Sequence, residues 1–366
     1  MKFVTLFEME NVHITKDVGL IPYGMHEYYN YDAYCASYDN GPYVSIDTVC
    51  KGLKMWFVKR KIGNFKIDSL LFLMKHAKEI DVLNVYHIGL DGASKILIYK
   101  IFNSNGKVYW KLDTGVGGYN NSGAYKRFIC RMALKKCCIV STELNEYRKS
   151  LEDEWKLPFI HVRNPYEPGM AKEFCEYKNR TNTILTVGLL GSEAKATEVL
   201  LEAFKRAVNE WGLKGWELKL VGPIEKTETD FEKYISGWYH ENPDMKSLVH
   251  FTGPIHDRKL IYYEYCMAKV FAFPSRHEGY SLALIEAAIS GCFIIASDIP
   301  CSREMTDQFQ YAASFPIDDA EQLAGQLYKW CMDEKEMEGM ARQLYECVKR
   351  KNSLYEICSI IQEKVR

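Results

Sequence analysis

Two glutamates stand eight residues apart in one short window, Glu278 in a predicted loop and Glu286 in the helix expected after it. The apolar residues 270–273 before the loop indicate a buried strand. On a helix, Glu286 lies four residues after Leu282 and therefore points along a largely apolar face. A carboxylate in that position costs free energy unless a partner satisfies it.

The start of this helix, expected over residues 281–290, is suited to an anion. The first backbone N–H groups, those of residues 279–282, have no partner within a helix, and the helix dipole favours a negative group beside them. A phosphate bound there would have Glu278 on one side and Glu286 about one helical turn deeper. This arrangement suits a nucleotide diphosphate-sugar, whose hydroxyls the carboxylates would reach. The structural alternative is a solvated loop glutamate and a capped or salt-bridged helix glutamate.

The window resembles the Glu-x7-Glu signature of retaining glycosyltransferases with the GT-B fold, in particular the large family four. The matching positions are Pro274, Ser275, Glu278, Gly279, Tyr280, Leu282, Glu286, Ala287, Gly291, Ile295, Ala296 and Ser297. The resemblance implies that Glu278 faces the transferred sugar as a catalytic residue and that Glu286 binds the ribose. It also implies donor contacts at the helix start, from Gly279, Tyr280, Ser281 and Leu282.

The sequence departs from the family where the donor diphosphate would be clamped. Lys195 matches the family lysine, but Leu189 stands where the family has an arginine. The loss of a guanidinium removes a charge-assisted contact, on the order of 1.5–3 kcal/mol. Either Arg276 in the signature loop supplies the missing cation, or the donor site is weakened or inactive. For Lys195 itself, the alternative is an ordinary surface lysine at a helix start.

Further site residues are expected at strand ends. The resemblance places the backbone of Gly253, Pro254 and Ile255 against the nucleotide base, although these residues also form a simple strand-to-loop break. In the first half, Gly19 in a predicted loop would let the backbone approach the donor. Asp113, where many family members have a histidine, would hold a sugar hydroxyl or the acceptor nucleophile, unless it only forms a turn.

Two series of alternating strands and helices must position these residues, and such alternation predicts doubly wound parallel sheets. Strands are expected at 3–7, 34–38, 82–87, 108–112, 138–141 and 159–162, then at 183–187, 217–221, 248–252, 270–273 and 293–296. Helices are expected at 67–79, 95–102, 124–136 and 143–155, then at 196–211, 229–239, 257–268, 281–290, 320–333, 336–349 and 353–365. His87, at the end of a strand, is read as a packed structural residue.

A segment rich in proline and glycine, residues 163–169, marks a domain boundary. The predicted domains are an acceptor-side Rossmann-like domain at 1–165 and a nucleotide-sugar-binding Rossmann-like domain at 166–350. The resemblance implies that the two α/β domains face each other across a cleft. It also implies that the C-terminal helix, within 351–366, crosses back to pack on the first domain.

Composition excludes several classes of protein. A net charge of −1 gives no reason to expect a nucleic-acid partner. No run approaches the roughly 18 apolar residues of a membrane span, and the acidic start does not resemble a signal peptide. The 12 cysteines are scattered without a C-x2-C pair, which predicts neither a zinc site nor a disulfide framework and fits a reduced cytoplasm.

Two basic segments in the predicted first domain, residues 56–61 and 125–136, raise the question of a membrane surface. The second reads as a basic amphipathic helix, and such helices bind anionic bilayers. One interpretation is peripheral contact with the inner membrane leaflet. The other is an ordinary exposed helix that packs its apolar side on the sheet.

Taken together, the sequence predicts a retaining glycosyltransferase that moves a sugar from a nucleotide diphosphate-sugar to a saccharide or lipid-linked acceptor. On the resemblance, we expect UDP as the nucleotide and surface polysaccharide biosynthesis as the setting. No metal is implied, because the helix dipole and cations would neutralise the diphosphate, and no pyridoxal lysine motif or other cofactor is expected. The alternative is a catalytically degenerate GT-B protein that acts as a binding or regulatory subunit, for which Leu189 is the main argument.

Overall fold

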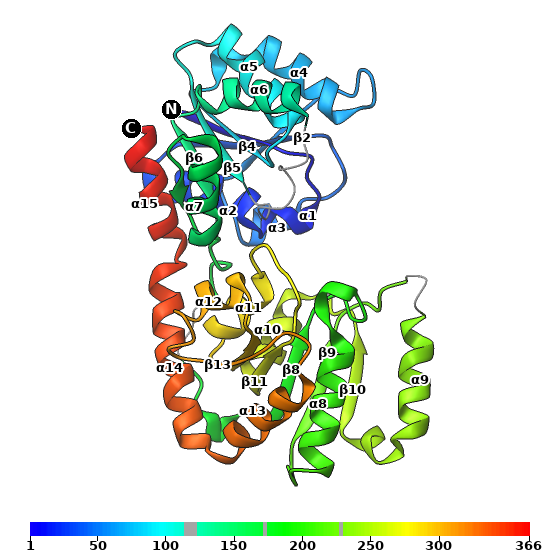
Figure 1. Cartoon of the computed structure of the whole chain (residues 1–366). Helices are drawn as coiled ribbons and strands as arrows, with labels where there is room; N and C mark the ends of the chain where they lie inside the picture. Colours follow the sequence, from blue (N-terminus) through cyan, green and yellow to red (C-terminus); the bar gives the residue numbers. More distant parts are fainter. Residues whose placement is uncertain (113–122, 171–173, 227–229) are drawn as a thin grey trace. The chain divides into compact units, whose positions relative to one another are not determined.

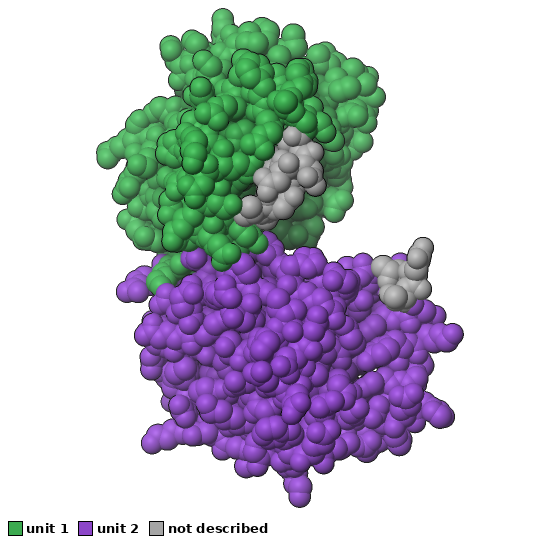
Figure 2. All heavy atoms as spheres, in the orientation of Figure 1, with its two compact units in different colours: residues 1–168, 351–366 green, residues 169–350 purple. Residues whose placement is uncertain are grey.

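The computed structural model describes residues 1–112, 123–170, 174–226 and 230–366. The chain forms two compact units. The first contains residues 1–168 together with 351–366, and the second contains residues 169–350 (Figure 2). Each unit has its own buried core around its own sheet.

The first unit is built on a parallel sheet that has seven strands over the described residues, in the order β3-β2-β1-β4-β5-β6-β7 (Figure 1). The strands are β1 (Lys2–Leu6), β2 (Asp32–Ser37), β3 (Lys54–Phe57), β4 (Val82–Tyr86), β5 (Lys107–Leu112), β6 (Ile139–Thr142) and β7 (Ile160–His161). The helices are α1 (Asn11–Ile14), α2 (Asp17–Tyr29), α3 (Val44–Thr48), α4 (Phe65–His76), α5 (Leu90–Phe102), α6 (Ala124–Leu134), α7 (Asn145–Trp155) and α15 (Leu354–Val365).

The second unit has a parallel sheet of six strands over the described residues, in the order β10-β9-β8-β11-β12-β13. The strands are β8 (Thr181–Val187), β9 (Glu217–Val221), β10 (Val249–Gly253), β11 (Ala268–Phe273), β12 (Phe293–Ser297) and β13 (Ala313–Phe315). The helices are α8 (Thr197–Asn209), α9 (Phe231–Glu241), α10 (Arg258–Met267), α11 (Leu282–Ile289), α12 (Pro300–Met305), α13 (Ala320–Met332) and α14 (Glu334–Lys351).

The central strands of the second sheet are apolar because helices cover both faces of a parallel sheet. Every residue of β11 and of β12 is buried. Helix α13 begins where a polar side chain satisfies an unpaired N–H group, because the Asp319 carboxylate accepts from the Gln322 backbone at 2.9 Å. The predicted pattern of doubly wound parallel sheets is therefore confirmed in both units.

The C-terminal helix α15 packs against α2 of the first unit. Leu354, Cys358 and Ile361 of α15 belong to the same buried cluster as Ile21 and Met25 of α2. This contact confirms the prediction that the last helix returns to the first domain.

The loop expected around Gly19 was wrong, whereas its contact with a donor stays a prediction. The segment expected to be a loop folds as α2, and Gly19 is buried in the first turn of that helix. A Cβ at this position would lie 2.3 Å from the carbonyl oxygen of Ile14, so the glycine allows close backbone packing here. The sequence analysis also missed β3, an edge strand of four residues that runs into the basic segment at 59–61.

Candidate functional site

The strand order of the second unit reverses between β8 and β11. From β8 the chain builds outward through β9 to β10, and it then returns to pair β11 along the other side of β8. Open α/β sheets bind ligands outside the carboxyl ends of the strands, at such a switch point. The loops that follow β8 and β11 are therefore where a ligand is expected.

Lys195 and Glu278 meet at this switch point. Lys195 ends a short 3-10 turn after β8, and Glu278 lies in the loop after β11. The Lys195 Nζ and the Glu278 Oε1 form a short ion pair, and the two side chains are 24% and 17% exposed. The structure thus brings together two residues that the sequence analysis placed at the donor site.

The loop that carries Glu278 is fixed on several sides. The Ser275 hydroxyl donates to the Glu278 carboxylate at 3.2 Å, and the Ser297 hydroxyl donates to the Ser275 carbonyl. The backbone N–H of Arg276 donates to the carbonyl of Ala194, at 2.8 Å, in the turn that carries Lys195. Because the two loops are hydrogen-bonded to each other, the carboxylate and the ammonium are held in a preorganised arrangement.

Glu286 projects from α11 and is only 16% exposed. Its carboxylate accepts a hydrogen bond from Arg258, the first residue of α10, at 2.7 Å. Burial and the nearby Glu286 carboxylate raise the pKa of Tyr265 well above its usual value, so the Tyr265 hydroxyl stays protonated. The sequence analysis did not find Arg258, whose pairing with Glu286 depends on the packing of α10 beside α11.

The start of α11 lies between the two glutamates along the chain. Ser281 occupies the N-cap position without a capping hydrogen bond from its side chain and is buried, whereas Gly279, Tyr280 and Leu282 are partly exposed. The N–H of Ser281 donates to the Cys301 thiol at 3.3 Å, a weak acceptor. The helix start can therefore still attract an anion through its remaining N–H groups and its dipole.

Arg276 does not stand beside Lys195 as an open cation. Its guanidinium donates to Asp318 at 2.7 Å, to the carbonyl of Glu193 at 2.7 Å and to Glu198 at 2.5 Å. These three acceptors occupy N–H groups of the Arg276 guanidinium that would otherwise bind a diphosphate. Leu189, at the position of the family arginine, is 40% exposed.

The turns after β8, β9 and β10 are joined by backbone hydrogen bonds. The N–H of Gly188 donates to Val221, and the N–H of Gly222 donates to Gly253, both at 3.0 Å. Gly222 has a φ of +143°, and a Cβ there would lie 1.8 Å from the Gly188 carbonyl oxygen, so only glycine fits. Gly253 ends edge strand β10, and Pro254 and Ile255 follow it. Strand β9 lies between β10 and β8, the strand that precedes the Lys195 turn.

The first unit contributes less of the predicted site. Gly19 is buried in α2, as described above, and Asp113 lies outside the described residues. His87, which the sequence analysis read as packed, is instead exposed directly after β4. Its φ is +56°, an uncommon conformation for a residue other than glycine, and its carbonyl accepts from the Trp110 indole at 3.0 Å. It stands at the β1–β4 switch point of the first sheet.

No group of three or more potential metal ligands (His, Cys, Asp or Glu) gathers among the described residues. Within the same ranges, no helix is both long and apolar enough to cross a membrane.

Comparison with known proteins gives a family match within the second unit. Residues 181–333 match the family described as glycosyl transferases group 1. No curated protein matches the chain. The matched span includes Lys195, Glu278 and Glu286.

Solved structures of similar fold extend over the whole chain at low identity. HepE of Anabaena in complex with UDP is 12% identical with a TM-score of 0.75, and the alignment covers 100% of this chain and 99% of HepE. A glycosyltransferase from Rickettsia africae is 15% identical with a TM-score of 0.78, and the alignment covers 100% of this chain and 97% of that protein. Sucrose-phosphate synthase from Thermosynechococcus elongatus is 14% identical with a TM-score of 0.70, and the alignment covers 99% of this chain and 98% of the synthase.

These comparisons confirm the GT-B fold class and the resemblance to group 1 glycosyltransferases. They also confirm the interpretation of the chain as a glycosyltransferase. The roles of the individual site residues remain predictions.

Proposed function

We propose that this chain, with its group 1 glycosyl transferase region at residues 181–333, is a retaining enzyme that transfers a sugar from a nucleotide diphosphate-sugar to a saccharide or lipid-linked acceptor. The observation that best supports this proposal is the ion pair between Lys195 and Glu278 at the β8–β11 switch point. A positive and a negative group side by side match a donor that is anionic at its diphosphate and rich in hydroxyls at its sugar.

The donor would occupy this site in a defined direction. Its diphosphate would take Lys195 and the start of α11, where cation and helix dipole both favour negative charge. Glu278 would then accept a hydrogen bond from a sugar hydroxyl, and Glu286 from the ribose hydroxyls. The backbone at Gly253 would lie against the base. We propose in addition that Asp113 holds either a hydroxyl of the transferred sugar or the hydroxyl of the acceptor.

The resemblance implies how the bond is exchanged. The bond between the anomeric carbon and the diphosphate oxygen breaks, and the acceptor oxygen bonds to that carbon from the same face. The proton of the acceptor hydroxyl passes to the departing diphosphate, so the anomeric configuration is retained. A pair of protein carboxylates of the kind that glycosidases use is then not required.

UDP is the first nucleotide to test, because HepE, which shares the fold, has been crystallised with UDP and with UDP-glucose. The acceptor is proposed to be a growing surface polysaccharide or glycolipid, by analogy alone. A hexosyl donor such as UDP-glucose is the matching choice for a first assay.

We also propose that the enzyme works in the cytoplasm, peripherally at the membrane face. The large apolar side chains of Tyr125, Phe128 and Met132 are exposed on α6 at helical spacing. Co-sedimentation with phosphatidylglycerol vesicles should fall for Phe128→Glu, whereas equal sedimentation of both proteins would contradict this placement.

A degenerate GT-B protein that binds a partner or ligand without turnover is the second candidate. Leu189 in place of an arginine favours it, and so does the engagement of Arg276 by two carboxylates and a carbonyl. This candidate would bind a nucleotide weakly or not at all.

An NMR assay of the transferred or hydrolysed sugar separates these readings. With UDP-glucose, the first-formed product should carry the same anomeric configuration as the donor. An inverted product would contradict the retaining mechanism. Nucleotide binding without any turnover, across UDP-, GDP- and dTDP-sugars, would favour the degenerate subunit.

A further inference from the structure

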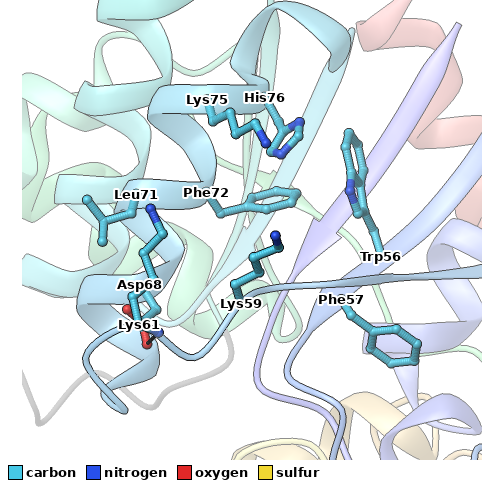
Figure 3. Close-up of a pocket in the computed structure, with 9 residues that line it drawn as sticks. All are labelled: Trp56, Phe57, Lys59, Lys61, Asp68, Leu71, Phe72, Lys75 and His76. Atoms are coloured by element: carbon cyan, nitrogen blue, oxygen red, sulfur yellow. Dashed lines mark hydrogen bonds between the residues drawn. The ribbon is translucent and has the colours of Figure 1, made fainter.

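A cavity of about 360 Å³ opens on the first unit beside the edge strand β3 (Figure 3). One wall comes from β3 and the loop that follows it, and the opposite wall comes from α4. This volume falls at the lower end of the range for small-ligand pockets.

Aromatic rings form one side of this cavity, which we call the β3–α4 pocket. The Trp56 ring packs edge to face against Phe72 and against His76, with ring centroids 5.0 Å apart in each pair. Phe57, the next residue of β3, lies exposed at the rim. These rings offer an apolar surface to a ligand that has C–H groups, such as the face of a sugar ring.

Three lysines line the same pocket: Lys59 and Lys61 from the loop after β3, and Lys75 from α4 (Figure 3). All three are exposed, and none forms an ion pair with another residue that the structure describes. Like charges around one cavity focus a positive potential and repel one another, so an anion bound among them lowers the electrostatic energy.

The pocket is also lined by the carboxylate of Asp68, which is hydrogen-bonded to other groups of the protein. The buried Asp68 side chain accepts from the Tyr38 hydroxyl at 2.7 Å and from the backbone N–H groups of Lys61, Ile62 and Gly63 at 3.0–3.1 Å. Burial and Asp68 raise the pKa of Tyr38 to about 12, so this hydroxyl remains a donor. Asp68 therefore fixes the loop that presents two of the lysines.

We propose that the β3–α4 pocket binds an acidic saccharide, with an anionic group of the sugar among Lys59, Lys61 and Lys75 and a ring face against the aromatic wall. The inference rests on the proposed function, because it assigns a chemical class to the saccharide acceptor. An inorganic anion would leave the aromatic wall unused, and an acyl chain would leave three ammonium groups unused. An acidic sugar uses both.

Isothermal titration calorimetry with tetragalacturonate tests this assignment, and maltotetraose serves as a neutral sugar of the same length. The wild-type protein should bind tetragalacturonate, more weakly at high salt, and should bind maltotetraose at least tenfold more weakly. The double variant Lys59→Met/Lys75→Met keeps the apolar stems and should lose at least tenfold in affinity for tetragalacturonate. Lys78→Met, an exposed lysine outside the pocket, is the matched control and should bind like the wild type.

Three results would overturn the assignment: no binding of tetragalacturonate, equal binding of the neutral sugar, or unchanged affinity in the double variant. Binding to phosphatidylglycerol vesicles that is lost in the double variant, without any binding of tetragalacturonate, would assign the pocket to a lipid headgroup instead. UDP titrated into the same samples should bind the double variant and the wild type equally. Failure of UDP to bind would count against the donor site while leaving the pocket result intact.

Discussion

Lys195 and Glu278 form an ion pair although 83 positions separate them in the sequence. The sheet explains the contact, because β8 and β11 are neighbouring parallel strands and each residue lies in the loop at its strand's carboxyl end. A diphosphate would take the ammonium, and sugar hydroxyls would take the carboxylate. Substitutions of these two residues should therefore affect different measurements.

Glu278→Gln should chiefly lower turnover. If the contact of Glu278 with the sugar tightens in the transition state, its loss reduces kcat while the affinity for UDP stays close to that of the wild type. Steady-state kinetics with UDP-glucose, together with a UDP titration, measures both quantities. Unchanged kcat with weakened UDP binding would assign Glu278 to the nucleotide instead.

Glu286→Gln should keep the fold and weaken UDP binding by about ten- to hundredfold, since a charged acceptor of the ribose hydroxyls is worth roughly 1.5–3 kcal/mol. The measurement is UDP affinity alongside Tm.

Arg258→Gln is the comparison for this prediction, because Arg258 pairs with Glu286. A partly exposed ion pair contributes about 0–1 kcal/mol, so a purely structural role predicts small and equal falls in Tm for both variants and no change in UDP affinity. That pattern would defeat the assignment of Glu286 to the ribose.

Leu189→Arg should strengthen the donor site. The side chain is 40% exposed after β8. It stands where the family pattern that the sequence resembles has an arginine, so a guanidinium there would add a cation to the proposed diphosphate site. UDP affinity should rise by about tenfold, corresponding to roughly 1.4 kcal/mol. Leu189→Gln, which lacks the charge, should show no such gain; an equal gain would mean that charge is not the cause.

Lys111→Met should destabilise the first unit. The fully buried ammonium lies 2.6 Å from Asp17 and 2.8 Å from Glu143, and it also contacts Asn164. Burial alone would lower the pKa of Lys111, but these carboxylates raise it above its usual value, so the lysine stays charged. Its removal takes the buried counter-charge away from the carboxylates of Asp17 and Glu143, at a cost of about 3–5 kcal/mol.

Urea unfolding measures this loss, and the exposed Lys135→Met is the control, expected within about 0.5 kcal/mol of the wild type. A Lys111→Met protein as stable as this control would mean that the buried charges are dispensable.

The part of the site that could be predicted from sequence is local. Glu278, the start of α11 and Glu286 lie on one strand–loop–helix segment, where spacing alone sets which face each side chain occupies. Lys195 could be predicted because its place after β8 matched the family pattern. In each case short-range geometry and a recognisable strand end were sufficient.

The parts that could not be predicted depend on tertiary packing. Arg258 reaches Glu286 only because α10 lies beside α11, and Lys111 meets Asp17 and Glu143 from three separate segments. Helix α2 was missed because it contains Gly19 and Pro22, both unfavourable in helices, and packing against α15 overrides that preference. Arg276 was one candidate for the cation missing at Leu189, and its pairing with Asp318 and Glu198, both distant in sequence, could not be predicted.

Titration of UDP into the wild-type protein and into Lys195→Met, by calorimetry, is the most direct test of the central claim that the β8–β11 switch point binds the donor. Lys214→Met, an exposed lysine on the same unit, is the control. The wild type and the control should bind UDP equally, and Lys195→Met should bind about ten- to hundredfold more weakly, as expected for the loss of a charge-assisted contact. If UDP, GDP and dTDP all fail to bind the wild type, or if Lys195→Met binds UDP as tightly as the control, the switch point is not the donor site.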